Sequence, residues 1–117
     1  MAPAPAANWI GIYVGTVESS GQEAGVVTRL DPSSQGLIGS YMFEEQNAGV
    51  QLGTLTDCKA SASHQLSCTW HDFYGTGVLE LNLSASGDEW LGRWRAANDP
   101  QWFMWNGKRQ TGKLLHF

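Results

Sequence analysis

Residues 75–94, GTGVLELNLSASGDEWLGRW, have the pattern of a β-hairpin. Leu79, Leu81 and Leu83 recur at every second position, which is the period of a strand with one buried face. The segment 84–88, SASGD, has the composition of a turn. Period-2 alternation resumes after this turn with Trp90, Gly92 and Trp94.

The two strands of this hairpin have one register in which both faces match. With Ser86 and Gly87 at the centre of the turn, the inward-facing pairs are Leu83 with Trp90, Leu81 with Gly92, and Leu79 with Trp94. The same register places Glu80 opposite Arg93 on the outer face, where opposite charges stabilise a cross-strand pair. A slip of one residue would remove both matches, so the sequence predicts this register.

Composition favours a small all-β domain. The chain has 117 residues, enough for one hydrophobic core, with 14 Gly, six Trp and only 15% charged residues. Its net charge is −4 and its seven Lys and Arg are dispersed, which argues against a nucleic-acid-binding surface. No apolar run approaches the length of about 18 residues that a membrane span needs.

Short alternating segments follow one another along the whole chain, and no segment has helical periodicity. Including the two strands of the hairpin, we expect eight strands; the other six are predicted at 9–16, 25–30, 37–43, 49–56, 66–72 and 101–109. The segment 31–34, DPSS, predicts a turn between the second and third strands. Short, evenly spaced strands of this kind predict an antiparallel up-and-down meander that closes into a barrel or folds into a sandwich.

Glycines inside the predicted strands recur in the form apolar-x-Gly-x-aromatic. The form is present at 9–13 (WIGIY), 37–41 (LIGSY) and 90–94 (WLGRW). Glycine weakens a strand locally, so its recurrence needs a structural cause. Two causes are expected in a small barrel: strong coiling of the sheet, and an aromatic ring from a neighbouring strand lying over the missing side chain.

The two cysteines, Cys58 and Cys68, flank a polar segment that predicts a hairpin tip near Ser63. Such a hairpin places them opposite each other, which is compatible with a disulfide. The alternative is a pair of buried free thiols. If Leu55 shares the inner face with this pair, a bulge is needed near Asp57. A disulfide would indicate a periplasmic or secreted protein, and free thiols a cytoplasmic one.

These features resemble the calycin superfamily of lipocalin, fatty-acid-binding and avidin-type barrels. Gly11 and Tyr13, with Trp9 beside them, look like the aromatic element that opens the first strand of calycins, with Tyr13 in place of the usual Trp. Arg109 looks like the arginine that packs across this element in lipocalins. Residues 37–41 are similar to a segment of avidin-type third strands. The resemblance implies an eight-stranded calycin-like barrel with a cavity, and structural roles for Trp9, Tyr13 and Arg109.

The aromatic side chains that point into the predicted barrel suggest a binding site for a small apolar or aromatic ligand. We expect contacts from Tyr41, Trp70 and Trp94, and polar contacts from Asp72, Tyr74 and Asn106. An eight-stranded barrel has room either for one small ligand or for its own side chains. The alternative is therefore that these aromatic residues form a packed core.

The segment around His71, Asp72 and Tyr74 is the one place where the sequence suggests catalysis, since a histidine beside a carboxylate can act as a general base. Adjacent strand residues point to opposite faces, however, so His71 and Asp72 are not expected to reach one substrate. No nucleophile, phosphate-binding or dinucleotide-binding motif is present. We therefore expect a non-enzymatic protein without a cofactor or metal, and an enzyme at this turn is the third hypothesis.

The ends of the chain suggest a second hypothesis, a secreted or periplasmic protein that binds or inhibits another protein. Residues 1–8 are rich in Ala and Pro and predict a flexible arm. Residues 9–110 form the predicted barrel domain, and 111–117 form an apolar tail. Either end could reach a partner, and the tail could also add a strand, cover a barrel end or form a homodimer contact.

Overall fold

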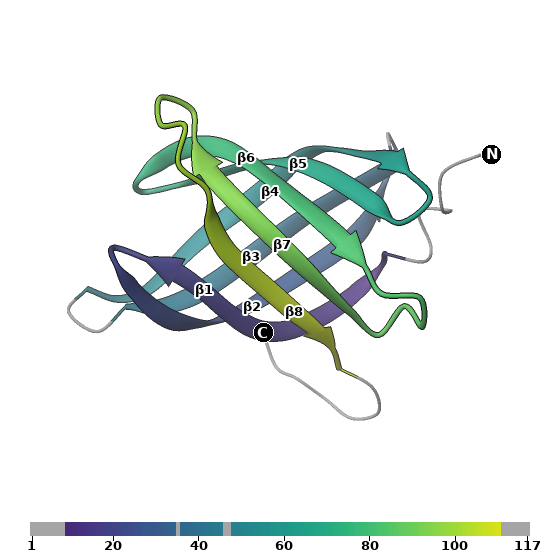
Figure 1. Cartoon of the computed structure of the whole chain (residues 1–117), viewed down its shortest axis with the longest axis horizontal. Helices are drawn as coiled ribbons and strands as arrows, with labels where there is room; N and C mark the ends of the chain where they lie inside the picture. The colour runs from purple at the N-terminus through teal and green to yellow at the C-terminus, as the bar shows by residue number, and fades with distance from the viewer. Residues whose placement is uncertain (1–8, 35, 46–47, 111–117) are drawn as a thin grey trace.

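The computed structural model describes residues 9–34, 36–45 and 48–110, which form eight antiparallel strands in a closed barrel (Figure 1). Each strand pairs with the next along the chain, and β1 closes the barrel against β8. The strands are β1 (Gly11–Ser19), β2 (Gln22–Ser33), β3 (Gly36–Glu45), β4 (Gly49–Ala62), β5 (Gln65–Asp72), β6 (Gly75–Leu83), β7 (Glu89–Ala96) and β8 (Phe103–Arg109). The predicted all-β meander barrel is confirmed. The predicted arm, 1–8, and tail, 111–117, lie outside the described residues.

The β6–β7 hairpin has the predicted register. The inward-facing pairs are Leu83 with Trp90, Leu81 with Gly92, and Leu79 with Trp94. On the outer face, Glu80 and Arg93 form an ion pair of 2.9 Å. The pattern of apolar and polar side chains was therefore sufficient to fix how these two strands align.

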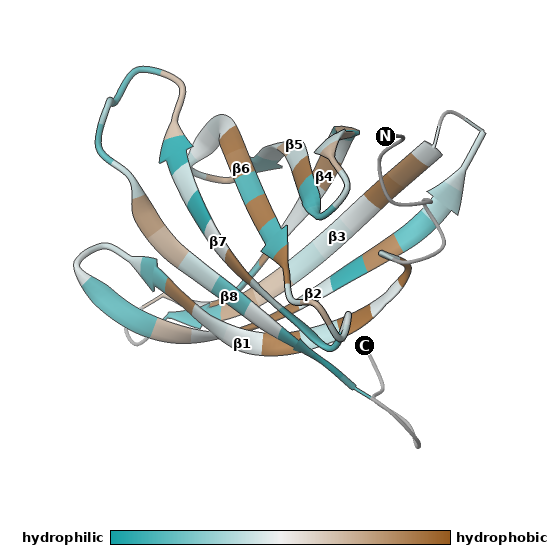
Figure 2. Ribbon diagram, turned by 45° about the vertical axis from the view of Figure 1, so that its right-hand side comes forward, coloured by the Kyte–Doolittle hydropathy of each residue, from teal (hydrophilic) through white to brown (hydrophobic). Residues whose placement is uncertain are grey.

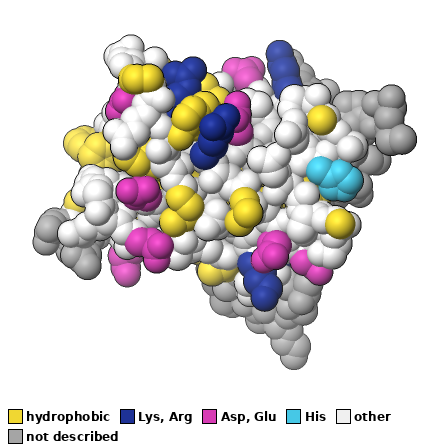
Figure 3. Space-filling view, viewed as in Figure 1, with side chains coloured by type: hydrophobic (Ala, Val, Ile, Leu, Met, Phe, Trp, Pro, Cys, Tyr) yellow, Lys and Arg dark blue, Asp and Glu magenta, His cyan; other side chains and the backbone are white. Residues whose placement is uncertain are grey.

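The interior of the barrel is the hydrophobic core. Side chains alternate between the core and solvent along each strand, and Figure 2 shows this as alternating bands of hydropathy, most clearly along β6. The largest fully buried apolar and aromatic side chains come from seven of the eight strands and from the segment just before β1: Trp9, Tyr13, Leu30, Tyr41, Leu55, Leu66, Leu79, Leu81 and Trp90. On the outer face that Figure 3 shows, hydrophobic side chains are interspersed with charged ones.

The predicted turn at 31–34 is wrong. Strand β2 continues to Ser33, with Asp31 opposite Ile38 and Pro32 opposite Leu37. A proline is tolerated at the end of a strand, where a missing N–H removes little of the ladder. The chain reverses only after this point, before Gly36, whose φ of 118° is a conformation that glycine adopts without strain.

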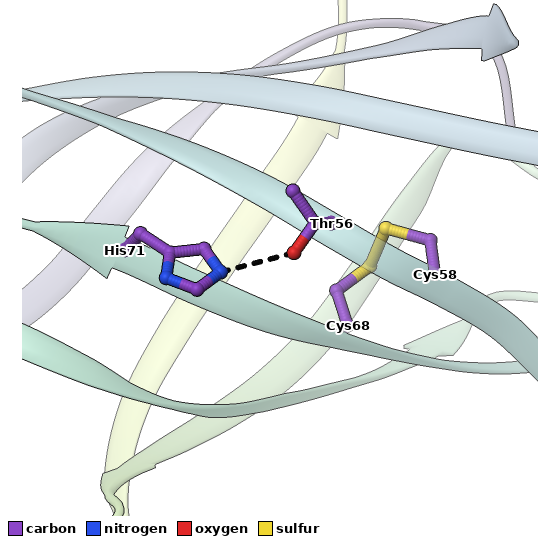
Figure 4. Close-up of a disulfide and its surroundings, with 4 residues drawn as sticks. All are labelled: Thr56, Cys58, Cys68 and His71. Atoms are coloured by element: carbon purple, nitrogen blue, oxygen red, sulfur yellow. Dashed lines mark hydrogen bonds between the residues drawn. A yellow bond between two sulfur atoms is a disulfide. The ribbon is translucent and has the colours of Figure 1, made fainter.

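A bulge in β4 brings both Leu55 and Cys58 into the core. The pairing of β4 with β5 shifts between Thr56 and Lys59, and Asp57 has a φ of 52°. Strict alternation from Leu55 would turn Asp57 and Lys59 inward, and the one extra residue of the bulge turns Cys58 inward in their place. The predicted disulfide between Cys58 and Cys68 is confirmed, and it ties β4 to β5 on the inner face of the barrel (Figure 4).

One end of the barrel, where the β2–β3, β4–β5 and β6–β7 turns meet, is closed by side chains. The guanidinium of Arg109 lies 4.9 Å from the centre of the Tyr13 ring and donates to the Ile10 carbonyl at 2.7 Å. The Tyr13 hydroxyl donates to the Trp9 carbonyl at 2.7 Å, and its ring packs against Trp90. Arg109, from the end of β8, thus packs across Tyr13 near the start of β1. It leaves the opposite end of the barrel as the place for a site.

In the described part of the chain, no helix is long and apolar enough to cross a membrane.

Candidate functional site

The open end of the barrel, at the left in Figure 1, contains a cavity of about 200 Å³, which we call the mouth cavity. It lies where the connections β1–β2, β3–β4, β5–β6 and β7–β8 meet. Its walls are mostly aromatic and its rim is polar, and they consist of Val17, Ser19, Ser20, Val26, Tyr41, Phe43, Trp70, Asp72, Tyr74, Trp94, Ala96 and Trp105. The predicted contacts Tyr41, Trp70, Asp72, Tyr74 and Trp94 are all among these residues.

The rings in the walls contact one another at defined angles. Trp70 and Trp94 meet edge to face, with ring centres 5.5 Å apart, and Tyr41 meets Trp105 in the same way at 4.7 Å. Tyr41 also stacks on Phe43 at 6.2 Å. Edge-to-face pairs add about 0.5–1.5 kcal/mol each to the stabilisation from burial, so the walls keep their shape without a ligand.

Each indole in the walls uses its N–H within the protein. Trp70 Nε1 donates to the Arg95 carbonyl at 3.2 Å, and Trp94 Nε1 donates to the Glu18 carbonyl at 3.1 Å. Trp105 Nε1 donates to the hydroxyl of Thr28, a fully buried residue, at 3.0 Å. These bonds fix the orientation of the rings. Because the N–H groups are already used, a ligand can contact only the carbon surface of the indoles.

Two glycines make room for the aromatic walls. Tyr41 lies over Gly53 of the neighbouring strand, and Trp70 lies over Gly77, so that a methyl group at either glycine would overlap the ring. This is the predicted cause of glycine within strands, although these glycines lie outside the repeated motif. Within the motif, Gly92 instead packs closely against backbone and Leu81.

Asp72 is the carboxylate of the mouth cavity, and it is held by two donors. The Tyr41 hydroxyl donates to its Oδ2 at 2.7 Å, and the Tyr74 backbone N–H donates to its Oδ1 at 2.8 Å. Burial raises the pKa of Tyr41 far above its usual value, and the hydrogen bond to Asp72 raises it further. Tyr41 is therefore a neutral donor at any physiological pH.

A second carboxylate, Glu45, lies at the edge of the cavity. It accepts a hydrogen bond from the Tyr74 hydroxyl and another from the Ser19 hydroxyl at 2.9 Å. The bond to Glu45 raises the pKa of Tyr74, which is exposed on its outer side. These contacts connect β1, β3 and the β5–β6 turn around the rim.

His71 lies on the outer face of the barrel and Asp72 on the inner face. The two ring nitrogens of His71 lie 3.0 Å from the Thr56 hydroxyl and 3.3 Å from the Thr76 hydroxyl, and Figure 4 shows the first of these contacts. The geometry keeps His71 away from the carboxylate and the cavity. As alternation predicted, the two side chains do not converge on one substrate position.

Asn106 lies away from the mouth cavity. It pairs with Leu91, which is exposed, and its neighbours Trp105 and Gly107 are buried, so its side chain is on the outer face. The expected contact from Asn106 is therefore not found, and the adjacent residue Trp105 lines the cavity in its place. The in-phase pair Trp105 and Gly107 carried the signal that was missed.

Ser19, Ser20 and Glu45 were also missed, because they come from the β1–β2 turn and the end of β3. Turn composition gives no indication of which end of a barrel a residue reaches.

Comparison with known proteins identifies no relative: no family model, curated protein or solved structure matches the chain.

Proposed function

We propose that this protein binds a small apolar or aromatic ligand in the mouth cavity, without catalysing a reaction on it. The observation that carries the proposal is the cavity itself, a space of about 200 Å³ at the open end of the barrel whose lining includes Tyr41, Trp70, Trp94 and Trp105. Concave sites with apolar walls and a few polar groups are the usual form of a ligand site. The general calycin-like shape supports the same function.

The size of the cavity limits the ligand. Drug-sized ligands occupy pockets of at least about 300 Å³, whereas an apolar cavity of roughly 150 Å³ accommodates benzene. The mouth cavity, at about 200 Å³, fits a ligand with one ring or a short branched chain. Below it the barrel is filled, with Leu30, Leu79 and Leu81 fully buried.

The test is a thermal-shift screen of small molecules that also follows tryptophan fluorescence. A true ligand raises the melting temperature and changes the emission of the wild type. In Trp94→Phe the change in emission is reduced, because Trp94 lines the cavity. The matched control is Trp102→Phe, since Trp102 lies on the outer face beneath Arg93. If no compound class changes either signal in the wild type, the proposal is wrong.

Protein binding is the second candidate, and exposed apolar side chains on the outer side of the rim, outside the cavity lining, favour it. Val50, Leu52 and Phe73 are 56%, 67% and 84% exposed. Gly53 pairs with Asp72, so the next residues outward, Leu52 and Phe73, lie together. If the rim binds a second copy of the chain, sedimentation shows association that Leu52→Ser/Phe73→Ser abolishes. A wild type that stays monomeric up to high concentration contradicts self-association.

We also propose a periplasmic or secreted location, on the ground of the disulfide between Cys58 and Cys68. Disulfides form and persist in oxidising compartments and are rare in the cytosol. Thiol labelling of the protein in its native cells tests this location. Two reactive thiols under denaturing conditions would place the protein in a reducing compartment.

A further inference from the structure

The walls of the mouth cavity offer ring faces and edges to a ligand, with few free donors. The indole N–H groups of Trp70, Trp94 and Trp105 are used within the protein, at 3.2, 3.1 and 3.0 Å from their acceptors. The face of an aromatic ring is electronegative, and a cation within about 6 Å of the ring centre is attracted to it. An anion is repelled by these ring faces.

The formal charge that lines the cavity is negative. Asp72 contributes a carboxylate, and among the described residues of the lining there is no Lys or Arg. Strand β7 carries two arginines near this end, but alternation turns them outward. The guanidinium groups of Arg93 and Arg95 lie 3.9 and 5.3 Å from the ring centre of Trp102. No cation from β7 therefore neutralises Asp72.

Asp72 keeps acceptor capacity for a ligand. Its two oxygens together offer about four lone-pair sites. The Tyr41 hydroxyl donates to one of these oxygens and the Tyr74 N–H donates to the other. Both donors are neutral. They hold the Asp72 carboxylate in one orientation, but they do not neutralise its negative charge.

The space beside the cavity is acidic as well. A second hollow of about 230 Å³ shares Ser19, Ser20 and Tyr74 with the mouth cavity, and its lining also includes Glu23, Glu44 and Glu45. Its described lining residues include no Lys or Arg. A ligand that approaches the mouth from this side passes these carboxylates before it reaches Asp72. Their negative charge raises the association rate of cations relative to that of anions.

We propose that the ligand of the mouth cavity is a small organic cation, an amine or quaternary ammonium compound with an apolar group. The ammonium group lies against the Asp72 carboxylate and the faces of Trp70 and Trp94, and the apolar group occupies the space toward Tyr41 and Trp105. This inference rests on the proposed function and adds to it the charge of the ligand. An anion is repelled by Asp72, and a neutral ligand forgoes the interactions with the carboxylate and the ring faces.

The experiment compares three probes of nearly equal size at neutral pH: benzylamine, which is a cation, benzyl alcohol, which is neutral, and benzoate. Affinities are measured by tryptophan fluorescence and calorimetry. We expect benzylamine to bind roughly tenfold more tightly than benzyl alcohol. A cation–π contact and a partly screened ion pair with Asp72 together account for a ratio of this size. Benzoate binds most weakly. Added salt weakens the binding of benzylamine and leaves that of benzyl alcohol unchanged.

The variant is Asp72→Asn, which removes the charge and keeps an oxygen for the Tyr74 N–H. Its matched control is Asp99→Asn, because Asp99 accepts a bond from the N–H two residues later in the same way, at 2.9 Å, and does not line the cavity. The tenfold preference is lost in Asp72→Asn and kept in Asp99→Asn. The salt dependence in the wild type tests the same charge if Asp72→Asn fails to fold.

The outcomes separate the two proposals. If benzyl alcohol binds the wild type as tightly as benzylamine does, or if the preference survives in Asp72→Asn, the inference of a cation is wrong and ligand binding stands. If none of the three probes binds and the broad screen is also negative, ligand binding itself is wrong, and the inference falls with it.

Discussion

The Tyr41 hydroxyl reaches across a neighbouring strand to the Asp72 carboxylate, with an oxygen-to-oxygen distance of 2.7 Å. Tyr41 is on β3 and Asp72 on β5, and between them on β4 lies Gly53, which is paired with both. Because Gly53 has no side chain, the Tyr41 ring lies flat over its backbone. The position of the Asp72 carboxylate thus depends on Gly53, although Gly53 has no side chain that could contact a ligand.

The first prediction concerns this glycine. In Gly53→Ala the new methyl group overlaps the Tyr41 ring, so the ring must move and its bond to Asp72 is lost. We expect a loss of about 1–3 kcal/mol in the free energy of unfolding, as for other overpacked sites, and weaker ligand binding. Urea denaturation measures the first effect. Gly25→Ala is the control, because no atom lies within 4 Å of a Cβ there. Equal stability of the two variants would contradict the prediction.

The second prediction concerns stability at alkaline pH. Burial raises the pKa of Tyr13 and of Tyr41 in the folded protein, while in the unfolded chain a tyrosine releases its proton near pH 10. The stabilisation from these pKa shifts is fully present below about pH 10. Above it the unfolded state holds fewer protons than the folded state, so the free energy of unfolding falls as pH rises, by up to about 1.4 kcal/mol per pH unit for each tyrosine.

Urea denaturation between pH 8 and pH 11 measures this slope. Tyr41→Phe removes one of the two buried groups, so above pH 10 the free energy of unfolding falls less steeply in this variant than in the wild type. Comparison with the wild type cancels the contribution of the lysines. An unchanged slope in Tyr41→Phe would show that this hydroxyl ionises near its usual pKa.

The third prediction concerns the disulfide. Cys58 and Cys68 are 10 residues apart, and closing such a loop stabilises a folded protein by about 2–4 kcal/mol relative to the open chain. We expect Cys58→Ala/Cys68→Ala to lose about this much in chemical denaturation. Reductant should lower the stability of the wild type to a similar level and leave the double variant unchanged. A double variant that equals the oxidised wild type would refute the prediction.

The fold was predictable from the sequence because its information is local and periodic. In the β6–β7 hairpin, alternation, turn composition and the Glu80–Arg93 pair all require one register, and this register is the one observed. The phase of alternation also identified Trp70 and Trp94 as interior residues. Wherever two or more independent patterns agreed on a strand face, the structure agreed with them.

The predictions that failed concern the phase of one strand and the end of another. Asn106 lies on the outer face of β8, whereas the adjacent Trp105 lies on the inner face and lines the cavity, so the expected contact from Asn106 had the wrong phase of alternation. The bulge at Asp57, with a φ of 52°, lies where the sequence required it if Leu55 faces inward, but the sequence did not decide whether Leu55 does. Pro32 was interpreted as part of a turn because its tolerance at a strand end depends on the neighbouring strand.

The last prediction concerns Thr28, whose hydroxyl accepts the Trp105 indole N–H inside the core at 3.0 Å. Thr28→Val keeps the shape of the side chain and removes the acceptor, so a buried donor is left without a partner. This costs about 1–3 kcal/mol in the free energy of unfolding. The control is Thr54→Val, at an exposed position of β4. Since Trp105 lines the mouth cavity and touches Tyr41, the emission change on ligand binding should also decrease in Thr28→Val and not in Thr54→Val. A Thr28→Val protein with wild-type stability would show that the indole N–H does not depend on this hydroxyl.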